Sequence, residues 1–396
     1  MPDVEFLNLL GILVLAVVAP LVAAVLPRVR VPAVVLEIVL GIAVGPHGLG
    51  WLSPDLAVQV VALLGLAMLL FLAGLEVDVR AWRGRLLGAI VVGYGLSLAV
   101  GYAVGWALRP VGWIDHPVLL AVTLSATSLG LVVAVLKDAS LLDTQMAKLT
   151  IAAASLADFA AVVLLSILFS MDGRGAGTKL SLLALFVALL IAVVLAAVVS
   201  ARNMRLATVV VSLQDGTAAI RVRLAVVLMV AFVVLAEHVG LESILGAFLA
   251  GAAVAALDRD STSHPHFRLK LESMGYGFLV PVFFVTSGMR LDVAGLLASP
   301  VDLLRVPVFV LALLAARGLP ALLFRRRLGR SATTATGFLL ATSLPFIVTA
   351  TQIGLLTGRM SDTTATALVC AGLVSVLVFP AVAVATAKSR VPAQTS

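Results

Sequence analysis

The sequence predicts an all-α polytopic membrane protein with about 13 transmembrane helices. Of the 396 residues, 62% are apolar and only 12% are charged, whereas a soluble domain has about half and about a quarter. Apolar runs are also unbroken, as in LLALFVALLIAVVLAAVV at 182–199. Because the strands of an outer-membrane barrel would alternate apolar and polar residues, we expect the spans to be helices.

The predicted spans are the apolar runs between charged breaks. They are expected near residues 6–26, 31–46, 56–76, 86–108, 117–136, 149–170, 180–200, 223–239, 241–257, 273–289, 304–324, 332–356 and 363–387. Most of the 27 Lys and Arg residues fall in alternate loops and in the C-terminal tail. Since positive residues concentrate in cytoplasmic loops, we expect an integral cell-membrane protein with its N-terminus outside and its C-terminus in the cytoplasm.

Three motifs recur in the same order along the chain. LEIVLG (36–41) returns as LESILG (241–246), GLEVDV (74–79) as GMRLDV (288–293), and ATSLGLV (126–132) as ATSLPFIV (341–348). The matched spans are an odd number of spans apart, so the second copy is predicted to be inverted, as in many secondary transporters. The expected parts are a first repeat at 1–178, a linking span and cytoplasmic loop at 179–222, a second repeat at 223–390 and a short cytoplasmic tail at 391–396.

Polar and helix-breaking residues interrupt two symmetry-related spans. They are Ser125, Thr127, Ser128 and Gly130 in the first repeat and Thr342, Ser343 and Pro345 in the second. Gly and Pro weaken a membrane helix, and hydroxyls can satisfy the freed backbone or bind a hard cation. A single hydroxyl in a membrane helix commonly bonds to its own backbone. The two matched clusters together predict broken helices at a binding site.

Asp158 and Arg317 are ionisable residues deep in predicted spans. Such residues are costly in a membrane and are functional candidates by default. Arg317 stays charged and needs an anionic partner or a water-filled cavity. The simplest expected partner is Asp158, although a purely structural pair remains an alternative. Ser155 precedes Asp158 by one helical turn and shares its face. Together they could hold Na⁺ or K⁺ at Asp158, or the carboxylate could take a proton instead, which is the chemistry of exchange.

The remaining features point away from other chemistry. Glu37 and Glu242 occupy matching places in the LEIVLG and LESILG motifs, where a structural or accessory role is expected. The cations are scattered rather than gathered on one face, so nucleic acid is not an expected partner. No nucleophile with a plausible base and no phosphate-binding loop stands out. We therefore expect neither an enzyme nor a cofactor.

Four segments resemble the monovalent cation:proton antiporter family, in its sodium/proton exchanger and potassium-efflux branch. They are LEIVLGIAVGPHGLG, LLFLAGLEVDVR, LSATSLGLVVAVLKD and FFVTSGMRLD. The resemblance implies a homodimer in which a fixed dimerisation domain supports a moving core domain, with two broken helices crossing at the site. It also implies that Asp158 is the essential aspartate, Thr127 and Ser155 are neighbouring ligands, and Arg317 is the basic residue of a late core helix.

The chain departs from the family pattern at three places. Ala157 stands where many members have a polar residue before the aspartate, and Pro345 with Phe346 stands where many have Gly and Glu. A single carboxylate suggests one-for-one, electroneutral exchange. The short segment after the last predicted span also leaves no room for a nucleotide-binding regulatory domain, so none is expected in this sequence.

The predicted function is secondary antiport of Na⁺ or K⁺ against protons through Asp158. Three alternatives fit parts of the same pattern. An organic-anion symporter could use the hydroxyl-lined breaks, a gated cation channel could use the same polar pathway, and a non-transporting sensor would need none of this chemistry.

Overall fold

The computed structural model describes residues 6–25, 31–77, 85–169, 219–257 and 265–388, together with the single positions 177, 181, 184 and 188. Among these residues no strand occurs, which confirms the predicted all-α class. Nine helical stretches within them are long and apolar enough to cross a membrane. The predicted span 180–200 and linking loop 201–222 lie almost wholly outside the described residues, as does the tail 391–396.

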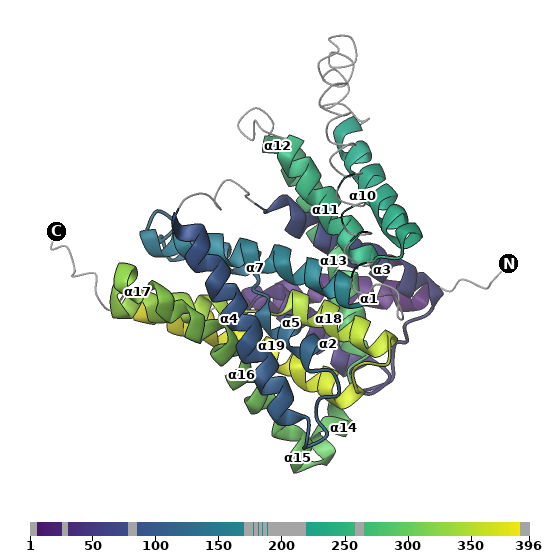
Figure 1. Ribbon diagram of the computed structural model, residues 1–396. Helices are drawn as coiled ribbons and strands as arrows, with labels where there is room; N and C mark the ends of the chain where they lie inside the picture. The colour runs from purple at the N-terminus through teal and green to yellow at the C-terminus, as the bar shows by residue number, and fades with distance from the viewer. Residues whose placement is uncertain are drawn as a thin grey trace, which may run out of the picture. The chain divides into compact units, whose positions relative to one another are not determined.

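Figure 1 shows the helices in chain order. They are α1 (Leu7–Val25), α2 (Ala33–Val44), α3 (Leu56–Leu75), α4 (Arg85–Leu108), α5 (Pro117–Ser125), α6 (Leu129–Asp138), α7 (Gln145–Phe169), α10 (Ile220–Val239), α11 (Ser243–Leu257), α12 (Pro265–Met274), a π-helical turn (Gly275–Leu279), α13 (Val280–Met289), α14 (Val293–Ala298), α15 (Pro300–Leu303), α16 (Arg305–Ala321), a 3₁₀ turn (Leu322–Phe324), α17 (Arg325–Leu340), α18 (Pro345–Leu356) and α19 (Asp362–Lys388).

Most of these helices follow the predicted spans, and the differences have local causes. α2 begins directly after Pro32, which suits a helix start, and ends before Gly45. The single span predicted at 332–356 is two helices, because the residues from Ala341 to Leu344 leave the helical path. The span predicted at 273–289 contains the π-helical turn, whose five residues include Gly275 and Gly277 and interrupt the regular α-helix.

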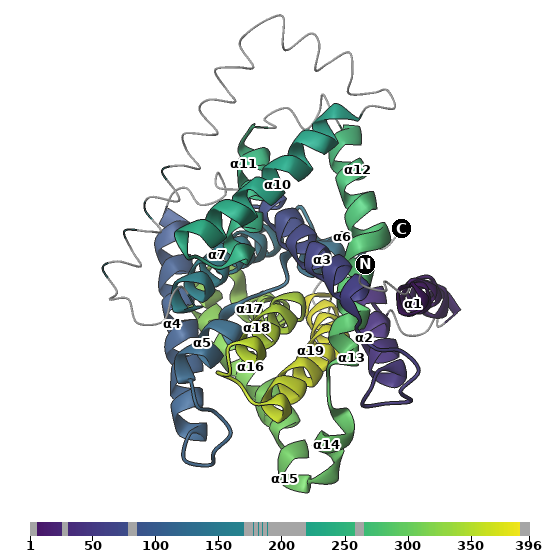
Figure 2. The same cartoon turned by 90° about the vertical axis from the view of Figure 1, so that its right-hand side faces the viewer.

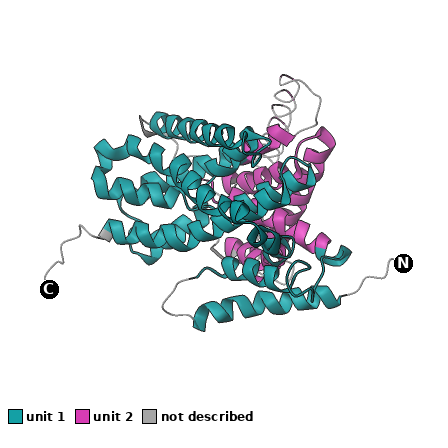
Figure 3. Cartoon of the chain, turned by 90° about the horizontal axis from the view of Figure 1, so that it is seen from below, with its two compact units in different colours: residues 1–58, 78–161, 284–396 teal, residues 59–77, 162–283 magenta. Residues whose placement is uncertain are grey.

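The chain divides into two compact units, which Figure 3 colours separately. Unit 1 comprises residues 1–58, 78–161 and 284–396, and unit 2 comprises residues 59–77 and 162–283. Within unit 1, α16 packs against α4, α5, α17 and α19, and α18 packs against α5 and α19. Figure 2 shows α16 to α19 gathered together. Their contacts bury many alanines, including Ala316, Ala335 and Ala371, which let helix backbones approach closely.

A matched pair of close helix crossings depends on glycine, one crossing in each unit. In unit 1, a Cβ on Gly41 of α2 would overlap the carbonyl oxygen of Val285 in α13, and a Cβ on Gly288 would overlap that of Ile38. In unit 2, a Cβ on Gly251 of α11 would overlap the carbonyl oxygen of Phe71 in α3, and a Cβ on Gly74 would overlap that of Phe248. Only glycine allows backbones this close.

The two crossings have the same internal spacing. Gly41 and Ile38 in α2 correspond to Gly251 and Phe248 in α11. In that register Glu37 corresponds to Ala247 rather than to Glu242. The LEIVLG and LESILG match instead pairs Gly41 with Gly246, so the two registers differ.

Candidate functional site

Two interrupted helices meet in unit 1. The first interruption is the extended segment Ala126–Ser128 between α5 and α6, and the second is Ala341–Leu344 between α17 and α18. The backbone N–H of Ser128 donates to the carbonyl oxygen of Thr342 across 2.9 Å. The breaks predicted from the two hydroxyl clusters thus lie in contact with each other.

Local sequence explains why both helices stop here. Pro345 is the first residue of α18, and a proline disfavours helical geometry in the residue before it. Ser128 precedes α6 in an extended conformation, as residues at a helix start usually do. Breaks in the middle of a membrane helix leave backbone groups that need polar partners.

Asp158 supplies such partners to the start of α6. Its Oδ1 accepts the backbone N–H of Thr127 at 3.1 Å, and its Oδ2 accepts that of Leu129 at 3.2 Å. The first N–H groups of a helix lack partners within the helix and carry partial positive charge, so a carboxylate is stabilised there. The side chain of Asp158 is partly exposed. The carboxylate is therefore held against the start of α6.

Arg317 reaches the same break from α16. It is 3% exposed, and its Nε and Nη2 donate to the hydroxyl of Thr127 at 3.0 and 2.6 Å. Nη1 donates to the hydroxyl of Ser97 at 3.2 Å. The Thr127 hydroxyl itself donates a hydrogen bond to the carbonyl oxygen of Leu340 at 2.7 Å. Thr127 thus joins the arginine to the backbone around both breaks.

The expected pairing of Arg317 with Asp158 takes an indirect form in these contacts. Thr127 donates its backbone N–H to Asp158 and accepts hydrogen bonds from Arg317 through its hydroxyl. The charges of two side chains that bind the same residue still attract each other, because salt screens buried charges only weakly. Arg317 and Asp158 are therefore linked through Thr127.

Two hydroxyls at the site lack hydrogen-bond partners among the described atoms. They are those of Ser155, one helical turn before Asp158, and Ser343, in the second break. Both residues are buried, at 2% and 0% exposure. Buried hydroxyls are normally hydrogen-bonded, so these two oxygen atoms are candidates to bind a ligand. Oxygen atoms of this kind suit Na⁺ or K⁺.

The other predicted residues lie beside the breaks or on other helices. Gly130 is in the first turn of α6, and Thr342 in the second break donates its hydroxyl to the carbonyl oxygen of Phe338 in α17. Glu37 is buried in α2 of unit 1. Glu242 directly precedes α11 in unit 2. The hydrogen bonds of the centre do not include either glutamate.

Sequence reasoning missed three polar residues around the breaks. Ser97 binds Arg317, Tyr94 lies 3.0 Å from the Ser125 hydroxyl, and Ser375 bonds to both backbone groups of Ser343. Tyr94 and Ser97 are three residues apart in an apolar helix and so share one face. That spacing is a signal which could have found them. Ser375 carries no comparable signal, because it is one of several hydroxyl residues in α19 and its position has no special spacing.

Comparisons with known proteins agree with this architecture. The family model described as "sodium/hydrogen exchanger, transmembrane" matches residues 13–388. The putative Na⁺/H⁺ antiporter YjbQ of Bacillus subtilis is 32% identical over 87% of this chain, and the chain spans 57% of that protein. The Na⁺/H⁺-K⁺ antiporter GerN of Bacillus cereus is 27% identical over 68% of each chain.

A solved structure shares the fold. The sodium proton antiporter MjNhaP1 from Methanocaldococcus jannaschii at pH 8 superposes with a TM-score of 0.61 and 16% identity. The match covers 96% of this chain and 97% of that one. The likeness therefore extends over almost the whole of both chains.

Proposed function

The chain belongs to the sodium/hydrogen exchanger family of integral membrane transporters, and we propose that it exchanges a monovalent cation, Na⁺ or K⁺, for protons through Asp158. The observation that carries the proposal is the position of Asp158 at the start of α6, between two helix breaks that touch. Members of this family are transporters and not enzymes.

Competition at one carboxylate explains coupled exchange. With a proton bound, Asp158 is neutral and does not attract a cation; without the proton, its charge and nearby hydroxyls form an oxygen site. Ser128 and Ser155 are the proposed neighbouring ligands, whereas the Thr127 hydroxyl is fully used by Arg317 and Leu340. The breaks free backbone dipoles that can stabilise an ion inside the membrane. One site that holds either ion, but never both, couples the two fluxes.

One carboxylate also supports electroneutral exchange of one cation for one proton. Alternating access of this site to the two sides of the membrane, by movement of a core domain within a homodimer, completes the proposal. The matched glycine crossings of the two units support two inverted repeats, which are the usual basis of alternating access. The N-terminus is proposed to lie outside and the C-terminus in the cytoplasm.

The test is cation-induced proton flux in proteoliposomes. A pH-sensitive dye is trapped in vesicles with an acidic interior, and Na⁺, K⁺ or Li⁺ is added outside in turn. Antiport predicts proton efflux that saturates with cation concentration and is insensitive to a clamped membrane potential. Single-channel currents without coupled proton flux would favour a channel, and uptake of an organic anion without a proton gradient would favour a symporter.

A further inference from the structure

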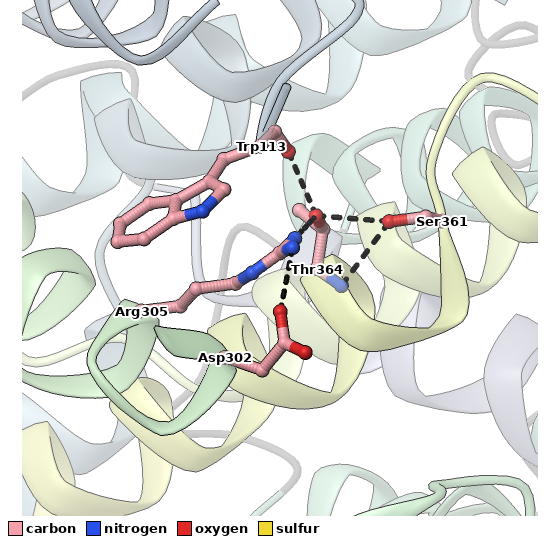
Figure 4. Close-up of polar contacts among 5 residues, drawn as sticks. All are labelled: Trp113, Asp302, Arg305, Ser361 and Thr364. Atoms are coloured by element: carbon pink, nitrogen blue, oxygen red, sulfur yellow. Dashed lines mark hydrogen bonds and ion pairs between the residues drawn. The ribbon is translucent and has the colours of Figure 1, made fainter. Parts of the chain in front are cut away.

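Arg305 joins several segments at one end of unit 1 (Figure 4). Its Nη1 donates to the Thr364 hydroxyl at 2.8 Å, and its Nη2 pairs with Asp302 Oδ1 at 2.7 Å. The guanidinium carbon lies 5.3 Å from the centre of the Trp113 ring. A planar guanidinium that is bound at two edges and stacked on an aromatic ring has little freedom to move.

Thr364 is the second centre of this cluster. Its hydroxyl accepts from Arg305 and from Ser361 and donates to the backbone carbonyl of Trp113 at 2.8 Å. One hydroxyl thus uses its donor and both acceptor positions. Through Arg305 and Thr364, the segment before α5, the start of α16 and the start of α19 are tied together (Figure 4).

The three helices that leave the cluster reach the two breaks. α5 ends at the break that contains Thr127. α16 carries Arg317, roughly 18 Å along the helix from Arg305. α19 carries Ser375, which bonds to Ser343. Because an α-helix is stiff over a few turns, a fixed arrangement at one end restricts the arrangement at the other.

Stability alone does not account for an arginine here. Its side chain is 12% exposed, and its Nε is buried without a hydrogen-bond partner among the described atoms. A buried ion pair is often no more stabilising than apolar residues of similar volume, because both charges lose their hydration. The contacts of Arg305 are directional, however, and apolar packing would not fix the three helix ends in one register.

We propose that Arg305 is a positioning residue for cation binding, which acts through α5, α16 and α19 on the arrangement of Thr127, Arg317 and Ser343. The proposal rests on exchange at Asp158. Loosening the cluster leaves every ligand present but less well preorganised, so the affinity for the cation falls. A merely structural clamp would change the amount or stability of the protein and leave the affinity of the folded fraction unchanged.

Two conservative variants of the full-length chain test this role. Thr364→Val keeps the shape of the side chain and removes its hydrogen bonds to Arg305 and Trp113. Arg305→Lys keeps the charge beside Asp302 but loses the two-edged geometry. The control is Thr357→Val, because Thr357 is an exposed residue directly after α18 whose hydroxyl, among the described residues, donates to the last turn of that helix. Cation-induced proton flux gives the half-saturating cation concentration, and a thermal melt gives the stability.

The expected result is a half-saturating concentration raised roughly three- to tenfold in Thr364→Val and Arg305→Lys, with Thr357→Val like the wild type. A wild-type half-saturation in the folded variants, a lowered maximal rate alone, or loss of folded protein in both variants would overturn the proposal. Failure of the proposed function itself would appear differently, because the wild-type protein would then show no cation-induced proton flux.

Discussion

Thr127 places its hydroxyl 2.6 Å from Nη2 of Arg317. The same residue gives its backbone N–H to Asp158. Thr127 therefore lies between the buried guanidinium of Arg317 and the carboxylate of Asp158, and Asp158 is partly exposed. In the proposed exchange, Thr127 therefore links the carboxylate that takes the ion to the buried arginine.

Thr127→Val should lower both stability and exchange. The substitution removes the acceptor of two buried guanidinium N–H groups. Leaving buried donors of a charged group without acceptors costs about 1–3 kcal/mol or more. Thr127→Ser retains the hydroxyl and is the matched control. Thermal melts of the purified protein and proton flux in vesicles measure the two effects. Equal melts and equal flux for Val and Ser would show that the hydroxyl does not hold Arg317.

Arg317→Lys should not retain the stability and cation affinity of the wild-type protein. A lysine is charged but cannot contact Thr127 and Ser97 together, because it lacks the planar, forked donors of arginine. We expect a lower melting temperature and a raised half-saturating cation concentration. A lysine variant with wild-type melting and half-saturation would mean that only the charge at this position matters.

Ser155→Ala separates ligand binding from stability. The hydroxyl is buried without a partner among the described atoms, so its removal loses no protein hydrogen bond and should leave the melting temperature unchanged or slightly higher. If the oxygen binds the cation, the half-saturating concentration rises. Thr334→Val, which changes an exposed hydroxyl in α17, is the control. An unchanged half-saturation in Ser155→Ala would remove Ser155 from the site.

Glycine substitutions test the two matched crossings. Gly41→Ala in unit 1 and Gly251→Ala in unit 2 each place a methyl group against a backbone carbonyl, and such overpacking costs about 1–3 kcal/mol or more. Gly88→Ala in α4 meets no atom within 4 Å and should be neutral or stabilising, since alanine is the better helix former. Thermal melts that rank all three variants alike would contradict the contacts.

The sequence predicted the parts of the site that carry local signals. Asp158 and Arg317 were recognisable because charges are costly in apolar helices. The breaks were recognisable because Pro345 and the two hydroxyl clusters disturb helices. Their positions, Ala126–Ser128 and Ala341–Leu344, agree with the structure to within a few residues.

Contacts between distant segments could not be read in the same way. Nothing in the sequence places Ser97 on Arg317 or Ser375 on Ser343, because these pairs depend on how helices cross. The LEIVLG and LESILG match suggested an equivalence of Glu37 and Glu242, whereas the glycine crossings follow another register. A short motif match in apolar sequence is weaker evidence than a backbone contact that only glycine permits.

The most direct measurement compares Asp158→Asn with Asp138→Asn in the proteoliposome assay. Asn at 158 keeps an oxygen that can accept from the start of α6 but can neither bind a proton nor carry a charge, so the fold should persist and exchange should cease. Asp138 is an exposed acid at the other end of α6, and its substitution should leave exchange intact. Cation-dependent proton flux that survives in folded Asp158→Asn would contradict the account.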